Sequence, residues 1–338
     1  MRPSELTQVL RAANPWWSRR QRVAWVPDDP ELSQRERHEW APATRLARTT
    51  LSEIGAPLTP GIATVLVGPR GVGKTTAAKD TVLRVLSDLT VDARAVVWVP
   101  VEAGRDDPDR PPLDPGDLEN VLHRPTRVGA PACDGPRLIV IDEASASEGW
   151  VDVVAAGAAG AQLLVTASVA GKAVDGLPAR NPGRLAVRHL RPATLAELIV
   201  AQPTADAETV REDFISHGGL PRALAEHRDL GRVSPEFLDL LAEAMRRDLC
   251  PGIGDRCRMD DVLVSLCSTT GRFIEPALFA AAMGMSPEHA EQLLDRLADA
   301  GVIDPRRGIV DPLLHHLPAL RDPSRPAPTP EHVASFSL

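Results

Sequence analysis

Cysteine is scarce in this sequence of 338 residues, and its few positions form no pattern of known use. The four cysteines have neither C-x-x-C spacing nor a nearby histidine pair suited to zinc, which disfavours a structural metal site. The N-terminus shows no signal-peptide pattern either. We therefore expect a cytoplasmic protein in which the thiols are reduced and buried. These residues are Cys133, Cys250, Cys257 and Cys267.

Long apolar runs and a strong positive charge are also lacking. No stretch approaches the roughly 20 apolar residues that cross a bilayer, since the Ala/Val-rich segment 151–171 is interrupted by glycines and polar residues. We therefore expect a soluble protein without a membrane partner. The net charge of −8 argues against a strongly basic coat for nucleic acid, although a local basic patch is compatible with that sum.

The segment "GPRGVGKTT" at residues 68–76 has the pattern of a phosphate-binding loop. It fits G-x-x-x-x-G-K-[ST], and it lies between a β-branched run, "TVLVG", and a helical pattern free of glycine and proline. In such a loop Lys74 reaches the β- and γ-phosphates, while the hydroxyl of Thr75 binds Mg²⁺. The expected nucleotide-binding residues here are Gly68, Pro69, Arg70, Gly71, Val72, Gly73, Lys74, Thr75 and Thr76.

The segment "RLIVIDEAS" supplies the acidic partner that a phosphate loop needs. Its apolar residues predict a buried strand that ends in Asp142 and Glu143. We expect Asp142 to bind Mg²⁺ together with Thr75, and Glu143 to orient and deprotonate the attacking water. The two motifs together therefore predict ATP and Mg²⁺ as the ligands.

Two further functions are assigned to polar residues near strand ends. The segment "AQLLVTAS" ends in hydroxyls, so Thr166 or Ser168 is a candidate γ-phosphate sensor, unless each only caps its own backbone. Phosphoryl transfer also calls for an extra cation. Among Arg180, Arg184, Arg188 and Arg191 we favour Arg184, because it follows a Pro-Gly turn and opens a strand.

From residue 51 onward, strand-like and helix-like runs alternate, which predicts an α/β fold with a mainly parallel sheet. The Pro- and Asp-rich stretch 102–117 is expected to be an exposed loop. After residue 191 helical patterns dominate. The expected strands are 64–67, 95–101, 138–141, 162–166 and 185–189.

The two ends of the chain have distinctive compositions. Residues 1–50 are rich in Trp and Arg, so this segment could stack on bases or a partner, or pack its indoles onto the nucleotide domain. Residues 259–311 have the helix and hairpin pattern of a winged helix, with Ser286 and Pro287 starting the presumed recognition helix. That helix exposes four acidic residues, which disfavours DNA, whereas Arg306 and Arg307 in the presumed wing suit phosphate.

Five segments follow one another in a specific order: "VLVGPRGVGKTT", "LIVIDEAS" followed by "GW", "LLVTAS", "PGRLAVRHLRPATLAELI" and "HGGLPRAL". This order resembles the AAA+ ATPases of the AAA_14 type, which are often joined to a DUF4143 region, and is similar to the STAND and archaeal-ATPase branch. The resemblance spans roughly residues 60–320. It implies a P-loop AAA+ core, a helical lid with the Gly-x-Pro motif at Gly219 and Pro221, and a C-terminal winged helix. The family's Gly-Ser after the fourth strand is Ala167-Ser168 here.

The resulting domain prediction has five parts: an N-terminal segment, an ATPase core, a lid, a winged helix and a Pro-rich tail. Three functional classes remain open, namely an ATPase that drives conformational change, a slow nucleotide-gated switch, and a DNA-binding initiator or regulator. We expect ATP or ADP as ligand and a protein partner or self-association, with an arginine finger acting within one subunit or between subunits. The parts are residues 1–50, 51–191, 192–252, 253–320 and 321–338.

Overall fold

The structure of the chain is a computed structural model that describes residues 1–18, 22–37, 51–52, 54, 58–102, 110–157, 160–169, 171–249, 259–268, 274–304, 308–325, 327–330 and 333. The described residues form two compact units, one made of residues up to 67 and of 74–189, the other of 68–73 and of 190 onward.

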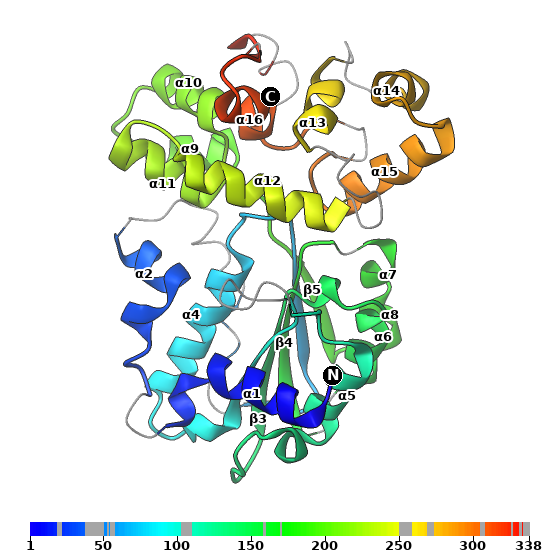
Figure 1. The fold of residues 1–338 in the computed structure, drawn as a ribbon. Coiled ribbons are helices and arrows are strands. Elements are labelled where there is room, and N and C mark those ends of the chain that lie inside the picture. Colours follow the sequence, from blue (N-terminus) through cyan, green and yellow to red (C-terminus); the bar gives the residue numbers. More distant parts are fainter. Residues whose placement is uncertain are drawn as a thin grey trace. The chain divides into compact units, whose positions relative to one another are not determined.

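The first unit is built on a parallel sheet of five strands in the order β2-β3-β4-β1-β5 (Figure 1). Each strand coincides with an expected one to within one or two residues, so the α/β prediction is confirmed. The expected strands were visible in the sequence because strands buried on both faces read as continuous apolar runs. They are β1 (Ala63–Val67), β2 (Val96–Pro100), β3 (Arg137–Asp142), β4 (Ala161–Ala167) and β5 (Leu185–His189).

Helices flank both sides of this sheet (Figure 1). Because side chains alternate along a strand, Val65, Ile139 and Leu163 share one face, and they pack there with α1, α5, α6 and α8. The helix α4 follows the phosphate-loop motif and contacts β3 and β4. The helices of this unit are α1 (Pro3–Ala13), α2 (Pro30–Arg37), α4 (Lys74–Ser87), α5 (Pro115–His123), α6 (Trp150–Ala156), α7 (Gly171–Asp175) and α8 (Leu177–Arg180).

The N-terminal segment protects the open edge of the sheet at β2. The side chain of Asn14 accepts from the backbone N–H of Trp98 at 2.6 Å and donates to its carbonyl at 2.8 Å. The indole N–H groups of Trp16 and Trp17 both donate to the carbonyl of Val96. These bonds satisfy edge groups that a strand otherwise leaves unpaired. The described tryptophans of this segment therefore pack onto the first unit, which is one of the two roles considered for them. Trp40 lies outside the described residues.

One prediction about the first unit is partly wrong. The end of the stretch expected to be an exposed loop forms the start of α5, because Asp114 caps the helix by accepting from the backbone N–H of Asp117 at 2.8 Å. Pro115 occupies the first helical turn, where its missing N–H has no cost. Leu113 is fully buried beside them. The proline and acidic residues therefore mark a helix N-terminus here; residues 103–109 lie outside the described residues.

The second unit is helical. Ser234 and Ser286 cap α12 and α15, since their hydroxyls accept from the backbone N–H of Phe237 and His289. After α15 a short antiparallel bridge joins Ile303 to Ile309. The helices are α9 (Leu195–Ala201), α10 (Ala207–His217), α11 (Pro221–Leu230), α12 (Pro235–Leu249), α13 (Met259–Ser268), α14 (Pro276–Met283), α15 (Pro287–Asp299) and α16 (Pro312–Arg321).

The turn between α10 and α11 is held by a buried carboxylate. Asp311, which caps α16, accepts from the backbone N–H of Gly219 at 2.8 Å and of Leu313 at 3.0 Å. A Cβ at Gly218 would lie 1.9 Å from the Asp311 carboxylate, and one at Gly219 would lie 1.9 Å from the carbonyl oxygen of Ala193. Only glycine fits these two close approaches. The Gly-x-Pro turn is therefore joined tightly to α16.

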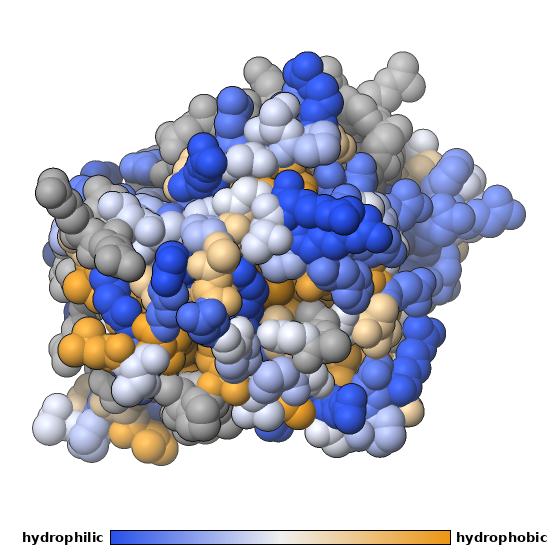
Figure 2. All heavy atoms as spheres, turned by 90° about the horizontal axis from the view of Figure 1, so that it is seen from below, coloured by the Kyte–Doolittle hydropathy of each residue, from blue (hydrophilic) through white to orange (hydrophobic). Residues whose placement is uncertain are grey.

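Among the described residues no helix combines the length and the apolar character needed to cross a membrane. Figure 2 shows one face on which hydrophobic patches lie between hydrophilic residues, an ordinary pattern for a protein surface.

Neither Cys133 nor Cys267 is in a disulfide, and Cys250 and Cys257 lie outside the described residues. In the Pro-rich tail, Val333 is fully buried.

Candidate functional site

The strand order brings the phosphate-loop motif and the acidic motif to the same edge of the sheet. β4 lies between β1 and β3, and all three strands run parallel. The loop follows the carboxyl end of β1, Asp142 ends β3, and Ser168 follows β4. Ligands of open α/β sheets bind outside the carboxyl ends of the strands. The topology alone thus assembles a candidate site from residues that lie up to 94 positions apart.

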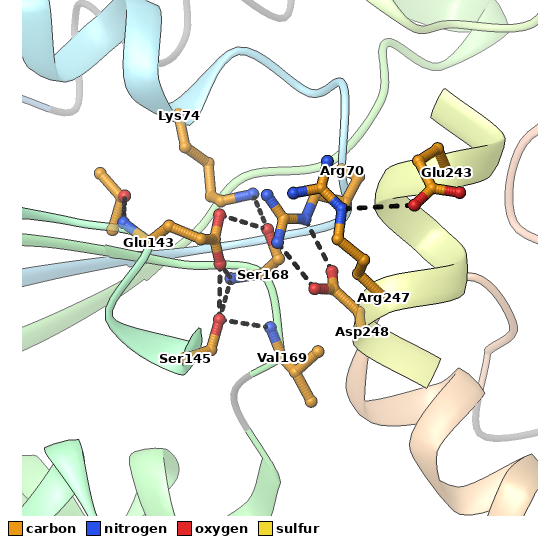
Figure 3. Close-up of polar contacts among 10 residues, drawn as sticks. Arg70, Lys74, Glu143, Ser145, Ser168, Val169, Glu243, Arg247 and Asp248 are labelled. Carbon is orange, nitrogen blue, oxygen red and sulfur yellow. Dashed lines mark hydrogen bonds and ion pairs between the residues drawn. The ribbon is translucent and has the colours of Figure 1, made fainter. Parts of the chain in front are cut away.

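Lys74 and Glu143 are joined through the hydroxyl of Ser168 (Figure 3). The Lys74 ammonium donates to Ser168 Oγ at 2.8 Å, and this hydroxyl donates to Glu143 Oε2 at 2.7 Å. All three side chains are buried. A buried cation and a buried carboxylate are costly unless they are paired or hydrogen-bonded. The hydroxyl of Ser168 therefore links the two buried charges by a pair of hydrogen bonds within the first unit.

The carboxylate of Glu143 is also held from β4 and from the segment that follows β3. Its Oε1 accepts from the backbone N–H of Ser168 at 2.8 Å and from the hydroxyl of Ser145 (Figure 3). The backbone of Glu143 is left-handed, with φ 57° and ψ 52°, which is uncommon for a residue with a side chain. Strain of this kind, on the order of 1–3 kcal/mol, clusters at functional sites. The structure thus holds Glu143 in one defined position.

A second group of hydrogen bonds surrounds Asp142. Its Oδ1 accepts from the hydroxyl of Thr75 at 3.0 Å and from that of Thr166 at 2.7 Å. The Thr166 oxygen in turn accepts from the backbone N–H of Glu143 at 2.9 Å. Loss of hydration on burial raises the pKa of Asp142 to about 6, and the charge of Glu143 adds to this rise, against the hydrogen bond from Thr166. The two hydroxyls at the end of β4 have different partners, Thr166 with Asp142 and Ser168 with Lys74.

Residues 68–73 of the loop pack within the second unit. Arg70 makes a two-point ion pair with Asp248 of α12, in which both nitrogen to oxygen distances are 2.7 Å. Gly71 and Gly73 have φ values of 79° and 94°, which favour glycine. A Cβ at Gly71 would lie 3.4 Å from Leu220, the residue before Pro221. The loop thus touches the start of α11, where Pro221 is buried at the first helical position.

Arg184 does not lie at this site. It directly precedes β5, and its carbonyl accepts from the backbone N–H of Ala63, the first residue of β1. The phosphate loop begins after Val67, at the other end of the same strand. A strand of five residues is roughly 16 Å long at 3.3 Å per residue. A finger acting within one subunit is therefore not supported for Arg184, because it opens a strand that runs parallel to β1.

The residues at this edge fit a nucleotide with Mg²⁺. A hydroxyl and a carboxylate whose oxygens lie 3.0 Å apart, at Thr75 and Asp142, are the hard oxygen ligands that Mg²⁺ prefers. The glycine-rich loop and the first turn of α4 offer backbone N–H groups to phosphates. A Cβ at Gly68 would lie 2.1 Å from the carbonyl of Leu190, so the loop backbone packs closely. The ammonium group of Lys74 supplies a positive charge for the phosphates.

Two contributors to this site were missed in the sequence. Ser145 lies two residues after Glu143, and a hydroxyl at that spacing is a recognisable local partner for a carboxylate. Asp248 is 178 positions from Arg70, and no spacing rule connects them. The first omission had a local signal, whereas the second depends on tertiary structure alone.

Comparison with known proteins agrees with the motifs. Residues 61–199 match the family model AAA_14, described as an AAA domain. No curated protein matches the chain. Similar solved structures include the ADP form of the ORC2 protein of Aeropyrum pernix, with 17% identity over 78% of this chain and 85% of that one and a TM-score of 0.33. The delta protein of the DNA clamp loader of Bacillus subtilis has 9% identity over 86% and 97% of the two chains and a TM-score of 0.34.

A third similar structure is the ORC1 protein of Aeropyrum pernix in complex with DNA, with 16% identity over 84% of this chain and 88% of that one and a TM-score of 0.33. At such scores these likenesses carry no conclusion about this chain. The family match, by contrast, covers β1, the phosphate loop, both acidic residues and β5. Residues 61–199 therefore form an AAA domain of the AAA_14 type.

Proposed function

We propose that the protein binds and hydrolyses ATP in an Mg²⁺-dependent manner and converts the nucleotide state into a rearrangement of its helical unit. The observation that carries this proposal is the hydrogen-bonded chain from Lys74 through Ser168 to Glu143, beside the pair formed by Thr75 and Asp142. A phosphate can replace Ser168 as the hydrogen-bond partner of Lys74, and a cation can replace the hydroxyl of Thr75 as the partner of Asp142. Binding of a nucleotide with Mg²⁺ therefore needs only an exchange of these partners.

The residues have separate roles in this proposal. Lys74 leaves Ser168 and donates to the β- and γ-phosphates, while Thr75 and Asp142 hold Mg²⁺. When bound, Mg²⁺ neutralises charge on the phosphates. Ser168, once released by Lys74, donates either to Glu143 or to the γ-phosphate and so acts as the sensor. Glu143 accepts the proton of the attacking water and keeps its orientation through the backbone N–H of Ser168.

The path to the helical unit begins in the loop itself. Arg70 is tied to Asp248 of α12, and Gly71 lies beside Leu220 at the start of α11. Movement of the loop on phosphate binding therefore acts on both helices. Gly219 continues the path, since Asp311 connects it to α16. We propose that α9 to α12 are the lid and that Pro221 senses the nucleotide.

We also propose that α13, α14, α15 and the following hairpin form a winged helix. Besides the bridge between Ile303 and Ile309, the backbone N–H of Val310 donates to the carbonyl of Val302. The exposed face of α15 carries Glu288, Asp295 and Asp299, which disfavour contact with DNA phosphates. Arg306 and Arg307 lie outside the described residues. A protein partner or a second copy of the chain fits this module better than DNA.

A slow nucleotide-gated switch is the second candidate, and the position of Glu143 favours it. Both of its carboxylate oxygens are engaged, by the Ser168 hydroxyl and N–H and by the Ser145 hydroxyl. A carboxylate held in this way must first give up one of these hydrogen bonds before it can accept the proton of an attacking water. A protein with this resting state hydrolyses ATP slowly until Glu143 is released.

The experiment that tests the function is the steady-state ATPase rate of the purified chain with Mg²⁺, with EDTA, and with single- or double-stranded DNA at low and moderate salt. We expect turnover with Mg²⁺ and none with EDTA, and no acceleration by DNA. Negligible turnover with nucleotide retained through purification identifies the switch. Stimulation by DNA identifies the DNA-directed class, and a chain that neither binds nor hydrolyses ATP contradicts the proposal.

A further inference from the structure

We propose that Asp213, His217 and His227 form a binding site for a transition-metal ion of the zinc type, placed across α10 and α11. One ligand atom from each of the three residues lies within 4.8 Å of the others. Asp213 and His217 are one helical turn apart on α10, and His227 comes from α11 after the Gly218-Gly219 turn. The site is separate from the phosphate loop and does not depend on the function proposed above.

The donor set suits such an ion. Imidazole nitrogen is a preferred ligand of Zn²⁺, Co²⁺ and Ni²⁺, and two histidines with one carboxylate leave a position open for water. Zinc lies about 2.0–2.2 Å from such atoms, so two tetrahedral ligands are roughly 3.4 Å apart. His227 Nε2 and Asp213 Oδ1 are already 3.7 Å apart. Small side-chain rotations therefore bring these two atoms to ligand distances.

The tautomer of His217 is already the one that a metal ligand needs. Its Nδ1 lies 2.9 Å from the backbone carbonyl of Asp213, and a carbonyl only accepts, so Nδ1 carries the proton. The lone pair is then on Nε2. Metal-binding histidines usually donate their second ring N–H to a carbonyl or carboxylate in this way. The backbone of α10 thus orients the first histidine.

His227 is the histidine of the pair whose ring can turn toward an ion. Its Nδ1 is buried and makes no hydrogen bond within the described part of the chain, although buried polar atoms are usually paired. Its ring stacks on His217, with centroids 3.4 Å apart and planes inclined at 25°. In-plane coordination requires one ring to turn out of the stack, and no hydrogen bond at Nδ1 opposes that turn in His227.

Neighbouring groups leave the site accessible. The Asp213 side chain is 52% exposed and that of His227 is 27% exposed, so an ion has a path from solvent. His316 of α16 approaches the same turn, but its Nε2 donates to the carbonyl of Ile215 at 3.0 Å, so we exclude it from the ligands. A bound ion connects α10 directly to α11 and stiffens the Gly-x-Pro turn between them.

The test is titration of the full chain, stripped by a chelator, with Co²⁺ as a visible probe and with Zn²⁺ by calorimetry, in excess Mg²⁺ and without nucleotide. We expect one equivalent of Co²⁺ to give tetrahedral d–d absorption, and Zn²⁺ to raise the Tm. His217→Gln and His227→Gln are each expected to weaken Zn²⁺ binding at least tenfold. Asp213→Asn, an isosteric change at an exposed side chain, tests the same site if either histidine variant fails to fold.

His289→Gln and Cys267→Ser are the matched controls. His289 is an exposed histidine of α15, and Cys267 lies 3.4 Å from His315, a separate pair of possible soft ligands. Both variants are expected to bind Zn²⁺ as the wild type does. Wild type that takes up less than about a tenth of an equivalent overturns the proposal, as does binding that survives the histidine and Asp213 changes. Loss of binding in Cys267→Ser alone assigns the ion elsewhere and also overturns it.

Discussion

Replacing Lys74 with alanine is expected to weaken ATP binding by a factor of about 10 to 100. The ammonium of Lys74 is proposed to leave Ser168 Oγ, now 2.8 Å away, and to donate to the phosphates. A hydrogen bond from a charged group contributes about 1.5–3 kcal/mol, which corresponds to this range of affinities. Calorimetric titration with ATP and Mg²⁺ measures the effect. Binding of ATP to Lys74→Ala with the affinity of wild type contradicts the assigned loop.

The matched control is Lys79→Ala on the same helix. Lys79 pairs with Asp29 and Glu31 of the N-terminal segment, so its loss is expected to destabilise that segment. Lys79 is not among the residues proposed to bind phosphate, and the effect of its charge on Asp142 is smaller than that of burial or of the hydrogen bond from Thr166. ATP affinity should therefore stay within about twofold of wild type. Circular dichroism of both variants establishes that the fold is retained. If the two changes weaken ATP binding equally, the loss reflects the fold rather than a phosphate contact.

Replacing Glu143 with glutamine is expected to lower the rate of ATP hydrolysis by a factor of 10² to 10⁴ while ATP still binds. Glutamine has the shape of glutamate, and its amide oxygen still accepts from the Ser168 N–H, now 2.8 Å from Glu143 Oε1. It cannot accept a proton from water, and a positioned general base contributes about this factor. Single-turnover hydrolysis and equilibrium binding, measured together, separate the two effects.

Ser145→Ala is the comparison that distinguishes a working Glu143 from a restrained one. The Ser145 hydroxyl donates to Glu143 Oε1 and accepts from the backbone N–H of Val169. If this hydroxyl holds Glu143 in a resting position, its removal raises the rate of hydrolysis severalfold. A lower rate means instead that Ser145 positions Glu143 for the reaction. Unchanged hydrolysis in Glu143→Gln rules out the assigned general base whatever Ser145 does.

Much of the first unit could be predicted because its information is local. The strands β1 and β3 are continuous apolar runs, and the loop after β1 has the glycine spacing that a tight backbone turn requires. Of the two acidic residues, Asp142 is the last residue of β3 and Glu143 comes directly after it. Parallel strands then place all of these at one edge, so this part of the site could be predicted without long-range information.

Arg184 and Arg70 show where local reading fails. Arg184 has the turn and the charge of a finger, but it starts a parallel strand, and the start of such a strand lies at the edge opposite the loop. This direction could have been inferred from the expected sheet. The partner of Arg70 could not, because a residue 178 positions away becomes its neighbour only through the packing of α12.

The histidines of the second unit had a signal that was not recognised. Asp213 and His217 stand four residues apart on a helix, and such residues share one face. His227 follows after two glycines that reverse the chain, so the two helices lie together. The spacing of Asp213 and His217 is visible in the sequence, but only the structure shows that the rings of His217 and His227 are stacked.

The measurement that tests the central claim most directly is an experimental structure of the chain with a non-hydrolysable ATP analogue and Mg²⁺. We expect the phosphates to lie along residues 68–76, Mg²⁺ to lie beside Thr75 and Asp142, and Lys74 to have left Ser168 for the phosphates. The opposite result is a nucleotide bound elsewhere, or one at the loop with the Lys74 to Ser168 hydrogen bond still intact. The first would show that these residues stabilise the fold and do not bind the phosphates, and the second would show that Lys74 does not bind them.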